Sequence, residues 1–115
     1  MNVIPFAAAA FALVAVGPTL VRAQPPAVVV NIDNFAFDAQ TVTISPGQTV
    51  TWVNNDDAPH TVVADDGKSF RSKVLDTGDK FSFTFNGAGS WGYFCSVHPH
   101  MTGKVVVKAQ KSPQG

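Results

Sequence analysis

The sequence lacks an excess of positive charge, a second cysteine and any glutamate. Its 115 residues contain eight Lys and Arg and eight acidic residues, all of them Asp. Proteins that bind nucleic acids use Lys and Arg to neutralise phosphates, so the balanced charge argues against that class. Cys95 is the single cysteine, so no disulfide within the chain can stabilise the fold. A small domain of this kind depends on its core alone or gains stability from another source, such as a bound metal.

Long amphipathic helices and internal repeats are also missing, whereas β-branched and aromatic residues are abundant. Short runs of alternating apolar and polar residues follow one another, separated by turn residues such as Gly, Pro and Asn. These runs cover 28–32, 40–44, 48–53, 60–64, 80–85, 90–95 and 103–108. Their close spacing predicts an all-β fold in which about eight strands form two packed antiparallel sheets.

The segment 1–23 differs from the rest and has the pattern of a secretory signal peptide. An apolar run over 6–16 is followed by a Gly-Pro break and by small residues at the usual cleavage offsets. We expect cleavage after Ala23, which leaves one domain over 24–109 and a disordered tail over 110–115. An uncleaved membrane anchor is the alternative, but the apolar run is shorter than the ~20 residues that span a bilayer.

The residues that point to chemistry lie in 93–101, which reads YFCSVHPHM. Cys95, His98 and Met101 follow one another at intervals of three, in a loop between two predicted strands. Thiolate, imidazole and thioether groups together favour copper among the biological metals. A lone Cys is also a common small buried residue. The added Met, the flanking strands and a distant His nevertheless favour a metal site over that simpler reading.

Copper sites for one-electron transfer commonly combine two His and one Cys in a trigonal arrangement, with a weak axial Met. The loop supplies only one of these histidines, so the second must come from another part of the chain. His60, which follows the polar loop 54–59 at the start of a predicted strand, is the best candidate. His100 is only two residues from His98, and side chains at that spacing point apart in an extended loop. Pro99 between them stiffens the loop. We therefore expect His100 to be exposed and not to bind the metal.

The sequence resembles the cupredoxins, the small type 1 blue copper proteins, and most of all their amicyanin and plastocyanin branch. Three stretches account for the resemblance: VTISPGQTVTW over 42–52, NDDAPH over 55–60 and YFCSVHPHM over 93–101. The resemblance covers nearly the whole chain after the signal segment. It implies an eight-stranded Greek-key β-sandwich that binds one copper ion. It also implies that the three strong ligands of the copper are His60, Cys95 and His98, and that Met101 is the weaker axial ligand.

Two positions depart from the pattern of many relatives. Thr61 stands where relatives have an Asn that ties the two ligand loops together, so this tie is expected to be weaker or different. Val97 stands where relatives with a short loop often have Pro. Its backbone N–H is therefore expected to donate a hydrogen bond to the Cys95 sulfur.

The function implied is the transfer of single electrons between transient protein partners through Cu(I) and Cu(II). A periplasmic copper carrier or copper-homeostasis protein with the same ligands is the main alternative, and a metal-free interaction module is another. A copper enzyme is not expected, because oxidases and nitrite reductases need further copper centres and the chain has three His in total. We expect an exported monomer in the periplasm or another extracytoplasmic compartment, without a membrane span after cleavage.

Overall fold

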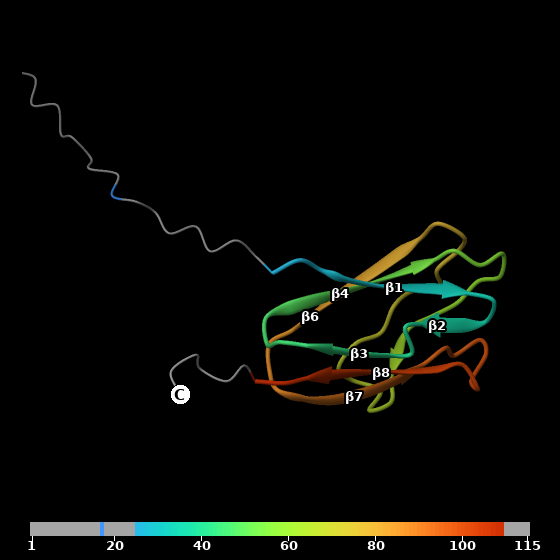
Figure 1. Cartoon of the computed structure of the whole chain (residues 1–115). Coiled ribbons are helices and arrows are strands. Elements are labelled where there is room, and N and C mark those ends of the chain that lie inside the picture. The colour runs from blue at the N-terminus through green and yellow to red at the C-terminus, as the bar shows by residue number, and fades with distance from the viewer. Residues whose placement is uncertain (1–16, 18–24, 110–115) are drawn as a thin grey trace, which may run out of the picture.

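The computed structural model describes residue 17 and residues 25–109, and this part of the chain contains eight strands. They are β1 (Val28–Asp33), β2 (Ala36–Asp38), β3 (Thr41–Ile44), β4 (Gln48–Asn54), β5 (Val63–Ala64), β6 (Lys80–Phe85), β7 (Gly89–Phe94) and β8 (Thr102–Val107). One sheet has the order β2-β1-β4-β6 and the other the order β3-β8-β7-β5 (Figure 1). The all-β sandwich expected from the sequence is thereby confirmed.

The expected signal peptide, apart from residue 17, and the expected tail over 110–115 lie outside the described residues. Within those residues, the structure contains no helix that could cross a membrane.

Both sheets are mixed, which corrects the expectation of wholly antiparallel sheets. β1 pairs in parallel with β4, and β3 pairs in parallel with β8, whereas the remaining neighbours are antiparallel. Parallel neighbours need a crossover connection. The chain makes one when it leaves the first sheet after β2, forms β3 in the second sheet, and returns to the first as β4. An alternating pattern reports which face of a strand is buried, but not the direction of the strand beside it.

Two further differences concern individual strands. β2 was not expected, because a three-residue strand with one buried side chain leaves too short a pattern to detect. Of the residues 60–64, which were expected to form one strand, only the last two do so, as β5. His60 instead forms an isolated bridge in which its N–H donates to the Leu75 carbonyl at 3.0 Å and its carbonyl accepts the Leu75 N–H at 2.7 Å. His60 therefore lies in a connection held against another connection, outside the regular strand.

The core lies between the two sheets and fixes the strand that leads into Cys95. Val50 and Trp52 of β4 are fully buried, as their alternation predicts. Trp52 packs edge-to-face against Tyr93 of the opposite sheet, with ring centroids 5.3 Å apart. On its other side, the Tyr93 ring leaves no room for a side chain on β8, since a Cβ at Gly103 would lie 2.3 Å from Tyr93 Cζ. The end of β7 is thus packed against the opposite sheet through Trp52 and against β8 of its own sheet through Gly103.

Candidate metal centre

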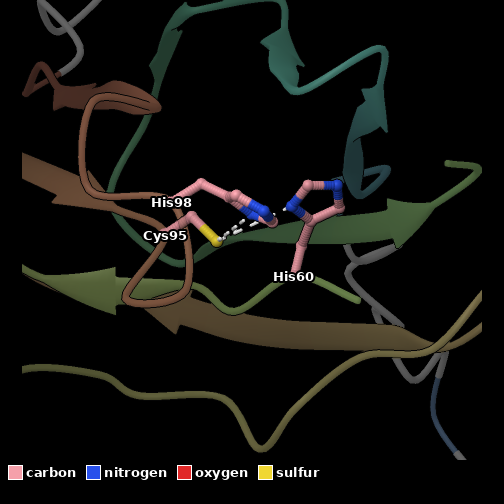
Figure 2. Close-up of side chains that lie close together, drawn as sticks. All are labelled: His60, Cys95 and His98. Atoms are coloured by element: carbon pink, nitrogen blue, oxygen red, sulfur yellow. Dashed lines mark hydrogen bonds between the residues drawn. The ribbon is translucent and has the colours of Figure 1, made fainter. Parts of the chain in front are cut away.

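His60, Cys95 and His98 converge beyond the end of β7, although two of them are far from the third in sequence (Figure 2). Their potential ligand atoms all lie within 4.8 Å of one another. The Cys95 Sγ atom is 3.6 Å from His60 Nδ1 and 3.8 Å from His98 Nδ1. His60 and Cys95 are fully buried, and His98 is half-buried. Both imidazoles therefore present the same nitrogen, Nδ1, to the sulfur.

The spacing of three between Cys95, His98 and Met101 reflects two successive turns. The His98 N–H donates to the Cys95 carbonyl at 3.2 Å, and the Met101 N–H donates to the His98 carbonyl at 2.9 Å. A third bond, from the Cys95 N–H to the Met101 carbonyl at 3.0 Å, closes the loop. Met101 is buried in this loop, whereas His100 is exposed and outside the cluster, as expected.

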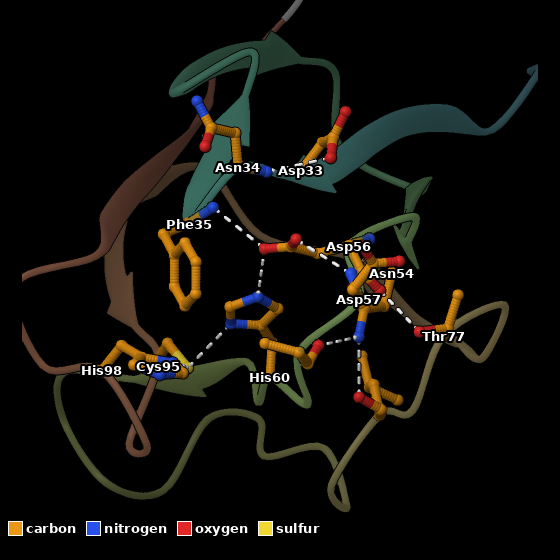
Figure 3. Close-up of polar contacts among 12 residues, drawn as sticks. Asp33, Asn34, Phe35, Asn54, Asp56, Asp57, His60, Thr77, Cys95 and His98 are labelled. Carbon is orange, nitrogen blue, oxygen red and sulfur yellow. Dashed lines mark hydrogen bonds and ion pairs between the residues drawn. The ribbon is translucent and has the colours of Figure 1, made fainter.

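A carboxylate holds the side of His60 that faces away from the sulfur (Figure 3). Asp56 Oδ2 lies 2.8 Å from His60 Nε2, and the same oxygen accepts the Phe35 N–H at 3.0 Å. The hydrogen bond from His60, followed by that from Phe35, lowers the pKa of Asp56, so the carboxylate is ionised at neutral pH. An ionised acceptor keeps the ring proton on Nε2 and leaves the lone pair of Nδ1 free for a metal.

Asn54, at the end of β4, fixes the loop that contains both Asp56 and His60. Its fully buried side chain donates from Nδ2 to the Ala58 carbonyl at 2.9 Å and to the Leu75 carbonyl at 2.8 Å. Its Oδ1 accepts the Asp56 N–H at 2.9 Å. These three bonds connect the loop to the sandwich, so the histidine is positioned by the rigid part of the fold.

Thr61 connects the two ligand loops. Its hydroxyl lies 2.7 Å from Ser96 Oγ and accepts the Ser96 N–H at 2.8 Å, and its own N–H donates to Cys95 Sγ at 3.4 Å. The connection between the two ligand loops, which we expected to be weaker or different without an Asn at this position, is therefore made by the hydroxyl and the backbone N–H of Thr61. The expectation for Val97 is wrong: within the described residues its N–H makes no hydrogen bond to the sulfur, and Thr61 supplies a backbone donor instead.

The surroundings of Cys95 favour its thiolate form. Burial raises the pKa of the thiol, but the hydrogen bond from the Thr61 N–H, followed by the contacts of the sulfur with the His60 and His98 rings, outweighs burial and lowers the pKa from 9.0 to about 6. The thiolate is the form that binds metals. One thiolate and two imidazoles, beside a buried thioether, make a soft donor set that fits copper.

The metal-free protein is expected to hold Cys95 as a thiolate at neutral pH. Its ultraviolet thiolate absorbance should disappear on acidification with a midpoint near pH 6. Because the pKa is lower in the folded state, the ionisation stabilises the fold fully above about pH 9, and this stabilisation is lost as the pH falls through about 6. Cys95→Ser removes the absorbance step and this part of the pH dependence. A midpoint near the ordinary value of 9.0 would contradict the prediction.

Asp56 and Phe35 belong to the site but were not found from the sequence. Asp56 lies four residues before His60, and one Asp in a chain with eight is a weak signal. Phe35 reaches the site only because the turn between β1 and β2 lies beside the loop that contains Asp56. No pattern in the sequence reports that proximity.

Comparisons with known proteins place the chain in a family of copper-binding proteins. The model for copper binding proteins of the plastocyanin/azurin family matches residues 26–108. Amicyanin from Paracoccus versutus is 42% identical over 86 residues, which are 71% of this chain and 65% of that protein, so the chain spans slightly less than two thirds of this relative. Plastocyanin from Scenedesmus fuscus is 36% identical over 84 residues, 63% of this chain and 86% of that protein. The crystal structure of the Paracoccus versutus amicyanin superposes with a TM-score of 0.67 at 39% identity and covers 76% of this chain and 86% of that one.

Proposed function

Since this chain belongs to the plastocyanin/azurin family of copper-binding proteins, we propose that it is a blue copper protein that passes single electrons between redox partners. The observation that supports this most is the buried cluster of His60, Cys95 and His98. We assign these three as the strong ligands of one copper ion and Met101 as its axial ligand. Copper bound there supplies the exchange of one electron between Cu(I) and Cu(II).

The protein's own contribution is to hold the donors still. Two turns and a closing hydrogen bond fix the loop from Cys95 to Met101. Asp56 fixes the His60 ring, and Thr61 joins the two loops. Donors that are positioned in advance need little rearrangement when the charge at the site changes, and this favours fast electron transfer.

Burial of the donors favours electron transfer over copper delivery. His60 and Cys95 have no exposed surface, so an acceptor protein cannot reach them to remove the ion by ligand exchange. His98 is half-buried and borders an open pocket of about 390 Å³, which apolar residues including Val97 and Pro99 also line. We assign the His98 ring as the route for the electron. An apolar rim around that ring suits a small, transient contact with a partner.

The proposal also covers where the protein acts. Residues 1–23 are assigned as a signal peptide that directs export, with cleavage after Ala23, to the periplasm or another extracytoplasmic compartment. There the monomer exchanges electrons with protein partners and performs no enzymatic reaction of its own.

Titration of the purified metal-free protein with Cu(II) tests the proposed function. One equivalent is expected to produce an intense visible absorption from the thiolate, which a mild reductant bleaches and an oxidant restores. Copper should remain with the protein through repeated cycles, whereas a delivery protein would release Cu(I) to a soft chelator. His100→Ala, at an exposed position outside the cluster, is the matched control and should behave as the wild type. A colourless product, or colour that a reductant does not bleach, would contradict the proposal.

A further inference from the structure

Phe35 lies in a strained turn between β1 and β2. Asn34 and Phe35 have φ angles of 49° and 56°, in the left-handed region that favours glycine. A bulky residue is uncommon there, because its Cβ approaches the backbone too closely. Phe35 is also 52% exposed, although an aromatic residue gains most from burial. An unfavourable backbone and an exposed ring at one position indicate that the ring contributes something else.

The Phe35 ring contacts both histidines of the cluster edge-on. Its centroid lies 4.9 Å from that of His98 at an interplanar angle of 84°, and 5.5 Å from that of His60 at 82°. These are the separations and angles of favourable aromatic pairs. Phe35 also lines the open pocket beside His98, so its ring stands between part of the cluster and the solvent.

The backbone of the strained turn is attached to the same site. The Phe35 N–H donates to Asp56 Oδ2 at 3.0 Å, and that oxygen also lies 2.8 Å from His60 Nε2 (Figure 3). One carboxylate oxygen therefore connects the turn to the buried histidine. Rotation of Phe35 into an ordinary backbone conformation would break this bond and move the ring away from both imidazoles.

We propose that Phe35 is a positioning residue that holds the His60 and His98 rings in place and covers them from water. This inference rests on the proposed function, in which both rings bind copper. His60 is buried and has Asp56 as a second support, whereas His98 lies on the surface loop and is half-buried. The loss of the Phe35 ring should therefore affect His98 more than His60. Asn34 and Phe35 form the two-residue loop of the β1–β2 hairpin, in which both positions need a positive φ and Gly is the usual second residue, so Phe35 occupies a position that disfavours it.

Phe35→Gly separates this role from ordinary packing, because it removes the ring and also relieves the backbone strain. We expect the metal-free variant to unfold within a few degrees of the wild type, because relief of the backbone strain offsets part of the lost aromatic contacts and of the greater freedom of glycine in the unfolded chain. The copper-loaded variant should nevertheless lose copper to a chelator roughly tenfold faster, since two aromatic contacts with the histidines are gone. The visible spectrum and the reduction potential should also shift.

Two variants serve as matched controls. Asn34→Gly relieves strain at the neighbouring position and keeps the ring, so it should match or exceed the wild type in unfolding temperature and release copper at the wild-type rate. Phe35→Tyr keeps the aromatic ring and adds one hydroxyl. It should restore both the copper release rate and the visible spectrum of the wild type.

Imidazole NMR of the metal-free proteins gives a readout that does not depend on copper. The His98 ring signals should be sharp and single in the wild type and in Phe35→Tyr, and averaged by motion in Phe35→Gly. If the wild type took up no copper, the proposed function would fail, and these signals would still decide whether Phe35 positions the rings. The inference is overturned if Phe35→Gly leaves both copper release and the His98 signals unchanged, whatever its unfolding temperature, because the ring would then have no effect on the histidines.

Discussion

A Cys95→Ser protein is expected to develop no intense visible absorption when Cu(II) is added. That absorption requires a thiolate bound to the metal, and the thiolate is available because its pKa is lowered to about 6. A serine hydroxyl does not ionise near neutral pH and is a harder ligand that suits copper poorly. Loss of a residue that only hydrogen-bonds to a metal ligand lowers metal affinity by roughly 10–100-fold. Loss of the Cys95 ligand itself should therefore lower copper affinity by much more. Visible spectroscopy and competition with a chelator measure both effects.

The structure indicates that Cys95→Ser will still fold. Serine is close to cysteine in size, and the Thr61 N–H that donates to the sulfur can donate to the serine oxygen instead. Thermal unfolding measures how much stability the variant loses. The two metal-free proteins are compared at a pH above the range in which the wild-type thiol ionises. A variant that folds and still shows the full visible band would refute the assignment of Cys95 as a ligand.

The sequence predicts those strands that have one face toward the core and the other toward solvent. The alternation over 80–85 predicts β6 with its observed bounds, because a period of two reports which side chains face the core. It could not predict β2, which is too short to show a period. It also could not reveal the parallel pairing of β1 with β4, because that pairing depends on a crossover through the other sheet.

The candidate site was predictable where its residues are local in sequence. The intervals between Cys95, His98 and Met101 match two hydrogen-bonded turns, so the spacing itself reports the geometry of the loop. His60 required an argument about the whole fold and the resemblance to a known family, and the structure places it in the cluster. That these residues bind copper remains a prediction, which the Cu(II) titration tests.

The supporting residues were beyond sequence reasoning because they depend on contacts between loops. Asp56 and its neighbour Asp57 are the same residue type in the same loop, and only the fold of that loop decides which one faces His60. Asn54 is fully buried for a similar reason, since its bonds reach the carbonyls of two connections. The turn at Phe35 combines a residue and a backbone angle that propensities would not place together.

Asp56→Ala is expected to weaken copper binding by roughly 10–100-fold, as the loss of a carboxylate that orients a histidine ligand does in other metal sites. The change leaves the Nε2–H group of the fully buried His60 without its acceptor, which costs about 1–3 kcal/mol. The Phe35 N–H loses the same acceptor. Without the carboxylate, the proton can move to Nδ1, the atom that faces the Cys95 sulfur, where it competes with the metal.

Two variants separate this effect from a general loss of charge or of loop structure. Asp57→Ala removes an exposed carboxylate next in sequence and should bind copper as the wild type does. Asp56→Asn keeps an oxygen that can accept the Nε2–H but lacks the negative charge, so its affinity should lie between those of Asp56→Ala and the wild type. Chelator competition measures the affinities, and imidazole NMR of the metal-free proteins reports which ring nitrogen is protonated. Equal affinities for Asp56→Ala and Asp57→Ala, with His60 still protonated on Nε2, would mean that the loop alone positions this histidine and that the carboxylate is dispensable.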